Sequence, residues 1–567
     1  MKQVEAILSK RQFVVPRPAA GRGKNKVSLV RIHWRPAVIG VIASTMLLSA
    51  CSGGNSVDRG SRSSDPVRGG TLVFSDVAAV ASWQTQALGS YTSGNALNSV
   101  LDRLTHFDKK TKKLVSWIAT DFTQNADATQ FTFTIRDGVT FSDGTPLDAA
   151  AVKANFDLWG LGNKDRQILP SRYVPDYDRA EVAGKSVTVH LKQPNASLLF
   201  ATSSIFLGLV APKTLALSNI DQGRPENVVG SGPFVFQSQV PDQEIVLTRR
   251  SGYAWAPASD GNQGEAYLDK VVIKVIPEVG LRSGALLAKQ VDVARGIQPF
   301  DEKPVRAAGY DVYAEPGVDL TANFAAFRIG NEFVADERVR KALLIGFDRA
   351  TLVETVLSES FPRPYSLLNR ADAGFVDLSD RLKPDVELAK RLLDEAGWAK
   401  GAGGLRYKDG KPLELTIPGA VQQPAVQPTW EYIEQQWRTD LGVKLNVRSG
   451  DPAFASAATT DKNVPLTPTR TWLYNGLASI FVGPRATTLL QDDPGLLALY
   501  ERERRATDPA ERVRVVQDLQ RYLIDKAYVL PTSEESQVFA AHPKVRIDFL
   551  SATYPDFQSA WIDPAVR

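Results

Sequence analysis

Cys51 is the only cysteine in the 567-residue chain. Its thiol is a reactive group, and the residues before it form a recognisable pattern. A lone thiol cannot close a disulfide within the chain, but it can act as a nucleophile, bind a metal or be alkylated. Before it come basic residues within 31–35, an apolar stretch at 36–48 and two small residues at 49–50. Because this order is typical of a cleaved export signal, we expect the chemistry of Cys51 to be tied to export.

The four residues that end at Cys51, Leu-Ser-Ala-Cys, resemble the bacterial lipobox. The resemblance implies that a diacylglyceryl group alkylates the thiol and that Cys51 becomes the new N-terminus. The apolar stretch is shorter than the roughly 20 residues that cross ~30 Å of hydrocarbon, which favours a cleaved signal over a membrane-spanning anchor. We expect a signal peptide at 1–50 and a flexible tether at 51–68. The protein would then be extracytoplasmic and lipid-anchored to the cell membrane, on its periplasmic or outer face.

Other groups that could support catalysis or bind a metal are scattered along the chain. The four histidines, at positions 33, 106, 190 and 542, have no ligand spacing, so no metal site is predicted. The sequence contains neither HExxH nor GxSxG. The segment 183–186 ends like a phosphate-binding loop, but Arg179 stands where that loop has its first glycine. We therefore expect no cofactor and no enzymatic activity.

The positive charge of the chain belongs to its N-terminal segment. The whole sequence has a net charge of +4, but residues 1–50 hold nine Lys and Arg and one Glu. The rest therefore has 58 basic and 62 acidic residues, a net charge of −4. A chain of this balance offers no argument for nucleic-acid binding.

Strand and helix patterns alternate after the tether. Phe131, Phe133 and Ile135 alternate with threonines, which predicts a half-buried strand, and Asp148 and Asp348 are predicted helix N-caps. Further helices are predicted at 385–396, 428–440 and 509–525, and further strands at 71–75, 187–191, 244–249, 271–276 and 443–447. About 500 residues are too many for one core and enough for two lobes, so the predicted class is α/β with two lobes.

Several sequence blocks carry a resemblance to a known family. They are Phe131–Leu147 with Val152 and Lys153, Gly230–Phe234, Leu268–Val272, Asp336–Ala342 with Asp348 and Arg349, and Ala389–Trp398. In this order they resemble the family 5 extracellular solute-binding proteins of ABC importers, which include dipeptide-, oligopeptide- and nickel-binding proteins. The resemblance covers nearly all of residues 69–563. Each block taken alone is scaffold, so the blocks point to the fold rather than to the ligand.

The resemblance implies a two-lobed fold of the periplasmic-binding-protein type II, with an extra subdomain in lobe one. We expect lobe one at 69–322 and 530–567 and lobe two at 323–529. The hinge would cross near 320–324 and 529–532, and closure would follow from a ligand that contacts both lobes. The resemblance also implies a monomer that works with ABC permease and ATPase subunits.

Two stretches resemble ligand-contacting stretches of dipeptide-binding members, and both lack the charged anchor. In 420–424 the resemblance implies an arginine for the peptide carboxylate, but Gln423 stands at the comparable place. In 470–476 it implies an aspartate for the amino group, but this stretch contains no acid. Because an unpaired buried charge costs several kcal/mol, we do not expect free dipeptides to be the ligand.

The candidate ligand-binding residues are amides, aromatics and one arginine. They are Gln422, Gln423, Arg470, Trp472, Tyr474 and Asn475, with Trp83, Tyr91 and Tyr554 as further candidates. Amides can donate and accept hydrogen bonds, and aromatic rings can cover an apolar ligand surface. We expect a peptide-like or other small organic solute, with a metal chelate such as a nickel complex or a siderophore as the alternative. A core role for Trp472 and Tyr474 stays open, as do a sensor, a chaperone or a hydrolase of this fold.

Overall fold

The chain divides into two units, residues 1–58 and Arg59–Arg567. The structure, a computed structural model, describes residues 65–87, 91–317, 320–420, 425–450, 454, 457–458, 461, 463–471, 473, 476–482, 490–534, 536–551 and 553–566. All of them belong to the second unit. Cys51, the predicted signal peptide and residues 51–64 of the predicted tether lie outside the described residues.

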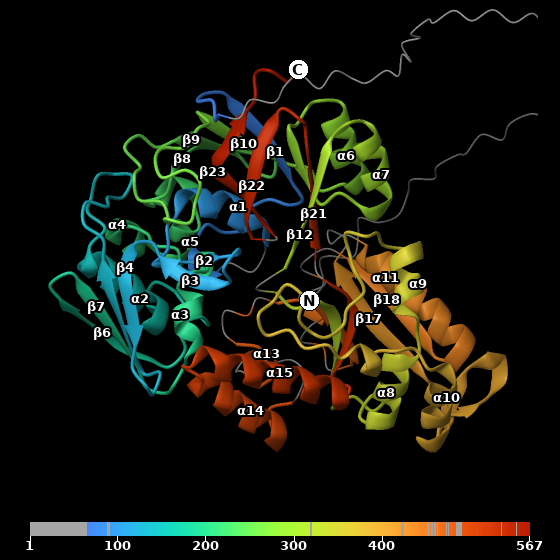
Figure 1. Cartoon of the computed structure of the whole chain (residues 1–567). Helices are drawn as coiled ribbons and strands as arrows, with labels where there is room; N and C mark the ends of the chain where they lie inside the picture. The colour runs from blue at the N-terminus through green and yellow to red at the C-terminus, as the bar shows by residue number, and fades with distance from the viewer. Residues whose placement is uncertain are drawn as a thin grey trace, which may run out of the picture. The chain divides into compact units, whose positions relative to one another are not determined.

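A seven-stranded sheet lies at the centre of the part of the chain expected to be lobe one, and we use that name for this part (Figure 1). Its order is β12 (Asp311–Pro316), β21 (Ser536–Ala541), β11 (Val293–Arg295), β1 (Thr71–Asp76), β10 (Lys270–Val275), β9 (Glu244–Arg249) and β8 (Phe234–Val240). β1 runs parallel to β10 and β11, and the other neighbours are antiparallel. The predicted strands 71–75, 244–249 and 271–276 are thereby confirmed.

The two faces of this sheet contribute to two hydrophobic cores. Leu72 and Phe74 point into the first core, to which α1 (Tyr91–Val100) and the hairpin of β22 (Val545–Ser551) and β23 (Tyr554–Ile562) also contribute. Val73, between them, contacts the second core, which contains residues of α6 (Val279–Leu287) and α7 (Pro299–Ala307). The alternation follows from the two-residue period of a strand.

A four-stranded antiparallel sheet forms the extra subdomain of lobe one. Its order is β4 (Ala119–Gln124), β5 (Gln130–Ile135), β7 (Ser186–Leu191) and β6 (Tyr177–Ala183), covered by α2 (Ala149–Leu161). Phe131, Phe133 and Ile135 are buried, and Asp148 accepts a hydrogen bond from the Ala151 N–H, so the predicted strand and N-cap are confirmed. The hairpin of β2 (Thr105–Asp108) and β3 (Lys113–Ser116) and the short helices α3 (Ser197–Ala201), α4 (Pro212–Leu215) and α5 (Asn219–Gln222) complete this part.

The part expected to be lobe two, for which we use that name, contains three small sheets and most of the longer helices. The sheets are β19 (Leu466–Thr469), β13 (Asn323–Phe327) and β20 (Val529–Ser533); the parallel pair β17 (Glu414–Ala420) and β18 (Lys444–Gly450); and β14 (Ala399–Lys400), β15 (Arg406–Lys408) and β16 (Lys411–Pro412). The helices are α8 (Glu337–Ile345), α9 (Arg349–Thr355), α10 (Val386–Glu395), α11 (Val426–Gln436), α13 (Ser479–Val482), α14 (Pro494–Arg505) and α15 (Pro509–Asp525). The predicted helices at 385–396 and 509–525 are confirmed, and the one at 428–440 is α11 followed by a π turn at Trp437–Leu441.

Two passages connect the large sheet with the sheet of β13. The chain leaves β12 at Pro316 and enters β13 at Asn323, and it leaves β20 at Ser533 and enters β21 at Ser536. β12 pairs with β21, and β13 pairs with β20, so the passages begin and end on neighbouring strands.

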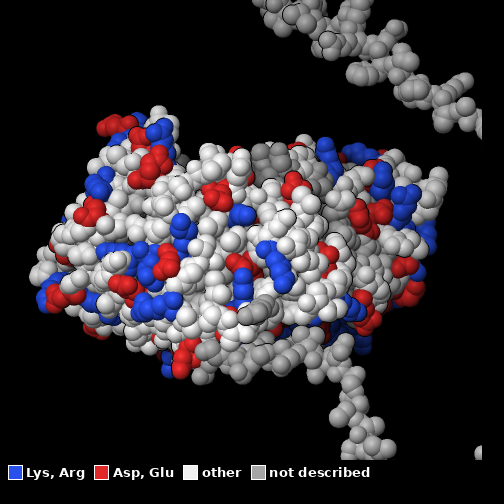
Figure 2. Space-filling model, turned by 90° about the horizontal axis from the view of Figure 1, so that it is seen from above, with Lys and Arg blue, Asp and Glu red and all other residues white. Residues whose placement is uncertain are grey.

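The described part of the chain contains no helix whose length and apolar character would let it cross a bilayer. Basic and acidic side chains are interspersed over the face seen in Figure 2. This mixture agrees with the near balance of charge in the chain after residue 50.

Candidate functional site

A pocket lies where α11 meets the sheet of β19, β13 and β20 in lobe two. It is an open hollow with a cavity volume of about 40 Å³. Its lining is Asn323, Phe324, Leu357, Phe361, Ala425, Val426, Thr429, Trp430, Pro468, Thr469, Thr532 and Ser533. None of these described residues is charged. We call this hollow the neutral pocket.

Polar groups of β13 and β20 are fixed at one side of the neutral pocket. The pairing register of the two strands shifts between Asn323 and Phe324. Asn323 Nδ2 donates to Ser533 Oγ at 3.1 Å, and Thr532 Oγ1 donates to the Asn323 carbonyl oxygen at 3.0 Å. Such irregularities redirect side chains and are frequent beside binding sites. Here the irregularity places amide and hydroxyl groups next to the buried ring of Phe324.

A buried arginine supports the strand that carries these polar groups. Arg349, at the N-terminus of α9, donates to the carbonyl oxygens of Pro531, Leu382 and Leu344, each at 2.9 Å. Burial lowers the pKa of Arg349 to about 9. Asp348 caps the same helix by accepting from the backbone N–H groups of Ala350 and Thr351, so that predicted N-cap is confirmed.

Gln298 of lobe one contacts a residue that lines the neutral pocket. Its Oε1 accepts a hydrogen bond from the Ala425 N–H at 3.2 Å, although 127 residues separate the two. Ala425 has a left-handed φ of 54° and precedes α11 directly. Gln298 itself precedes α7 and is buried. Sequence reasoning missed Gln298, because nothing in its neighbourhood distinguishes it from an ordinary residue before a Pro-initiated helix.

The six main candidate residues are neighbours in sequence of residues that line the neutral pocket. Gln423 precedes Ala425 by two residues and Gln422 precedes it by three, and Arg470 directly follows Thr469. Ala425 and Thr469 both line the pocket. Arg470 is partly exposed, and its carbonyl oxygen accepts from Thr469 Oγ1 at 3.4 Å. Gln422, Gln423, Trp472, Tyr474 and Asn475 lie outside the described residues. Their ligand contacts stay predictions.

The three further candidates belong to lobe one. Trp83 is 1% exposed and its ring lies 5.6 Å from that of Phe236 in an edge contact. Tyr554 is buried in β23 against Gly94 of α1, where a Cβ on the glycine would lie 2.2 Å from the tyrosine ring. Tyr91 is the first residue of α1, and the structure does not describe its side chain. The packing of Trp83 and Tyr554 has its own structural reason, and their contact with a ligand stays a prediction.

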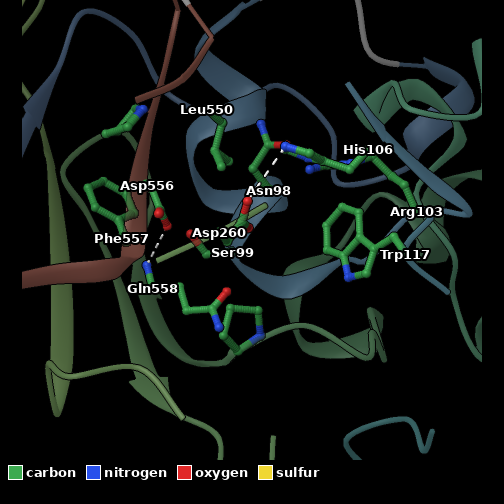
Figure 3. Close-up of a pocket in the computed structure, with 12 residues that line it drawn as sticks. Asn98, Ser99, Arg103, His106, Trp117, Asp260, Leu550, Asp556, Phe557 and Gln558 are labelled. Carbon is green, nitrogen blue, oxygen red and sulfur yellow. Dashed lines mark hydrogen bonds and ion pairs between the residues drawn. The ribbon is translucent and has the colours of Figure 1, made fainter. Parts of the chain in front are cut away.

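A second, charged hollow lies in lobe one, between α1, β2 and the hairpin of β22 and β23 (Figure 3). His106 Nε2 lies 3.6 Å from Asp260 Oδ1, and Asp556 Oδ1 accepts from the Gln558 N–H at 3.0 Å. Burial and the nearby charge of Asp556 raise the pKa of Asp260 to about 7. Burial and the charge of Arg103 lower the pKa of His106 to about 4. Near neutral pH, Asp260 is therefore partly protonated and His106 is neutral.

The raised pKa of Asp260 predicts a pH-dependent stability. The folded chain binds a proton that the unfolded chain releases near its ordinary value of 3.8, so this stabilising contribution is complete below pH 4 and is lost as the pH rises through 7. Asp260→Asn removes this loss. From pH 5 to pH 8, we expect the free energy of unfolding of the variant to rise by about 2 kcal/mol relative to that of the wild type. Urea unfolding at both pH values measures this difference. A difference that does not change with pH would contradict the assignment.

Within the described residues, no group of three or more His, Cys, Asp or Glu side chains could hold a metal ion. The neutral pocket offers amide and hydroxyl groups and aromatic surface. It is suited to hydrogen bonding and apolar packing with an uncharged group.

Comparison with family models and known proteins gives consistent matches. Residues 113–487 match the model described as bacterial extracellular solute-binding proteins, family 5 Middle. The nickel-binding periplasmic protein of Escherichia coli (strain K12) is 24% identical over 462 residues, which cover 76% of this chain and 83% of that protein.

Two solved structures have a similar fold. NikA from Brucella suis, solved in complex with Fe(III)-EDTA, matches with a TM-score of 0.72 and 24% identity, covering 87% of this chain and 100% of that one. The oligopeptide-binding protein AppA from Bacillus subtilis, solved with a nonapeptide, matches with a TM-score of 0.74 and 18% identity, covering 88% and 100%. The two-lobed α/β fold expected from the sequence is thereby confirmed.

Proposed function

Because the chain belongs to the family 5 bacterial extracellular solute-binding proteins of ABC importers, we propose that it captures a peptide-like solute whose recognised part is uncharged. The observation that carries this proposal is the neutral pocket, which no charged residue lines among those described. Members of the family are substrate-binding transport proteins rather than enzymes.

The uncharged lining decides against a ligand terminus in the neutral pocket. A carboxylate or ammonium group there would lose its water without gaining an opposite charge, at a cost of several kcal/mol. Phe324, Phe361 and Trp430 offer ring surface, and Thr429 and Thr532 offer hydroxyl groups. A peptide side chain or a backbone amide suits these groups. The termini of a free peptide would lie elsewhere, in water or beside other residues.

A metal chelate is the second candidate. One relative is a nickel-binding periplasmic protein, and a protein of similar fold was solved with Fe(III)-EDTA bound. The described residues contain no metal-binding group of their own. A metal would therefore enter inside an organic chelator, and the neutral pocket would contact the chelator rather than the ion.

We also propose the arrangement around the binding function. Lobe one comprises residues 69–316 and 536–567, and lobe two comprises residues 323–533, because β20 pairs with β13. The passages at 316–323 and 533–536 then act as the hinge, in place of the crossings expected near 320–324 and 529–532. Cys51 carries the lipid that holds the protein to the membrane, where a monomer meets its permease and ATPase partners. Gln422, Gln423, Arg470, Trp472, Tyr474 and Asn475 border the ligand together with the neutral pocket.

Native mass spectrometry of the full chain purified from its own host tests these proposals together. We expect one solute per chain, released on unfolding and identified as a peptide-like molecule, and a protein mass that includes the acylated Cys51. We then expect N-acetylated, C-amidated peptides to compete for the site at least as well as the same peptides with free termini, since the neutral pocket cannot pair a charge. Tight binding of only free-termini peptides would contradict the proposed ligand chemistry.

A further inference from the structure

A contact between the two lobes lies away from the neutral pocket, where α14 meets the subdomain of lobe one (Figure 1). Arg504, near the C-terminus of α14, forms an ion pair with Asp176 at 2.6 Å. Its Nε donates to the Pro194 carbonyl oxygen at 2.8 Å. In return, the Ala196 N–H donates to the Arg504 carbonyl oxygen at 2.7 Å. The Arg504 side chain is 15% exposed, so water screens these bonds only in part.

A second arginine strengthens the same contact. Arg512 of α15 donates to Ser197 Oγ at 3.0 Å, at the start of α3. Gln124 Nε2 of β4 donates to the Thr507 carbonyl oxygen, in the turn between α14 and α15, at 3.4 Å. Hydrogen bonds from two helices of lobe two and from three separate segments of the subdomain thus meet at one place.

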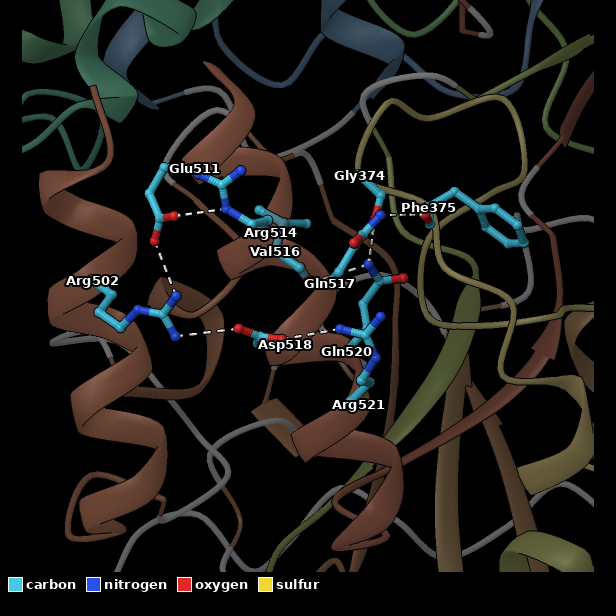
Figure 4. A network of polar contacts seen from close by, with 10 residues as sticks. All are labelled: Gly374, Phe375, Arg502, Glu511, Arg514, Val516, Gln517, Asp518, Gln520 and Arg521. Carbon is cyan, nitrogen blue, oxygen red and sulfur yellow. Dashed lines mark hydrogen bonds and ion pairs between the residues drawn. The ribbon is translucent and has the colours of Figure 1, made fainter. Parts of the chain in front are cut away.

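The α14–α15 hairpin is firmly attached to lobe two. Gln517 donates to the Phe375 carbonyl oxygen at 3.0 Å, and Gln520 donates to that of Gly374 at 2.7 Å (Figure 4). Within the hairpin, Arg502 pairs with Glu511 at 3.0 Å and with Asp518 at 3.2 Å. A movement of the subdomain against the hairpin is therefore a movement of lobe one against lobe two.

The residue next to Arg504 fixes the backbone close to the predicted ligand stretch. Glu503 is 2% exposed and accepts from the N–H groups of Leu477 and Ala478 at 2.7 and 2.9 Å. Burial raises the pKa of Glu503 and the charge of Arg512 opposes this rise. A Cβ at Gly476, whose φ is +84°, would lie 2.8 Å from the Glu503 carboxyl carbon. Glu503 thus binds the backbone that follows 470–475, and its neighbour Arg504 binds the subdomain of the other lobe.

We propose that Arg504 is a positioning residue for solute capture, because it latches the subdomain of lobe one to the α14–α15 hairpin of lobe two and so stabilises the arrangement of the lobes in this structure. The latch consists of Arg504, Asp176, Pro194, Ala196, Arg512 and Ser197. Its effect on binding rests on the proposed function, whereas the contact between lobes does not. If the latch breaks when the lobes separate, it raises the population of the arrangement that contains it and slows release of a ligand held between the lobes.

The amide of Ala196 gives a readout that needs no ligand. It donates to the Arg504 carbonyl oxygen of the opposite lobe at 2.7 Å, so its hydrogen exchange reports opening of the latch directly. In the full chain without ligand, we expect Arg504→Ala and Asp176→Asn each to speed exchange at Ala196 about tenfold. Arg504→Lys, which keeps the charge, should recover part of the protection. The thermal unfolding temperature should change little.

Arg502→Ala is the matched control, because Arg502 stands on the same helix but its ion pairs stay inside lobe two. We expect wild-type exchange at Ala196 in this variant. Equal acceleration in Arg502→Ala, or wild-type exchange in both Arg504→Ala and Asp176→Asn, would overturn the latch.

Binding of an N-acetylated, C-amidated peptide pool separates the latch from the proposed function. We expect Arg504→Ala to release bound peptides several-fold faster while their association rate stays unchanged. If the wild type binds none of these peptides but exchange at Ala196 still accelerates in Arg504→Ala, the proposed ligand chemistry fails and the latch stands. Unchanged peptide release together with unchanged exchange would overturn the latch.

Discussion

Thr429→Arg is expected to weaken binding of the co-purifying solute about 100-fold. Thr429 lies on α11 and lines the neutral pocket, and the residue as a whole is 7% exposed. A guanidinium group introduced there meets hydroxyl, amide and apolar neighbours and no carboxylate among the described lining residues. Leaving such a charge unpaired costs about 3 kcal/mol, which corresponds to a factor of about 100 in the dissociation constant. Isothermal titration calorimetry with the identified solute measures it.

Gln427→Arg is the matched control for this charge. Gln427 precedes Thr429 by two residues on the same helix, but it is exposed and donates to Glu431 at 2.7 Å. We expect wild-type affinity in Gln427→Arg. Thr429→Val, which keeps the shape and removes only the hydroxyl group, should weaken binding about fivefold, the effect of one hydrogen bond. Unchanged affinity in both Thr429 variants would show that the solute does not use the neutral pocket.

The local parts of the fold were predictable because their signals are local. The caps at Asp148 and Asp348 each depend on a side-chain oxygen within three residues of the N–H group that it binds. The strand at 130–135 depends on a two-residue alternation, and α15 on the apolar spacing of its own residues. The assignment to a two-lobed fold came from blocks whose order along the chain resembles a family, which is a signal that local physics alone does not contain.

The pocket and the latch were not predictable in the same way, because their parts come from distant segments. Asn323 and Ser533 are 210 positions apart, and Arg504 and Asp176 are 328 apart. Neither Thr429 nor Gln298 stands in a distinctive sequence pattern. The stretches at 420–424 and 470–476 were singled out only by resemblance. Ala425 and Thr469, which adjoin these stretches in sequence, line the neutral pocket. Which strands pair, and with what register, decides such sites, and a single sequence leaves this open.

Arg295→Met is expected to lower the free energy of unfolding by about 3–5 kcal/mol, the usual loss when one partner of a buried ion pair is removed. Arg295 Nη1 lies 3.0 Å from Asp76 Oδ1, and both side chains are 2% exposed. The pair joins the ends of the parallel strands β1 and β11, and Arg295 Nε also donates to Gln537 of β21 at 3.3 Å. The methionine would leave the Asp76 carboxylate buried without its cation. Urea unfolding measures the change.

Two further variants decide whether burial or the ion pair itself sets this effect. Lys411 and Glu332 form a pair of similar length, 2.8 Å, but their side chains are 59% and 63% exposed, so Lys411→Met should cost less than about 1 kcal/mol. The double variant Asp76→Asn with Arg295→Met should recover part of the lost stability, because the carboxylate that Arg295 neutralises is then removed together with it. An equal loss in Arg295→Met and Lys411→Met would contradict the role of burial. Since Gln537 lies one residue into β21, just after the proposed hinge passage, the stability that this pair provides acts where the two lobes join.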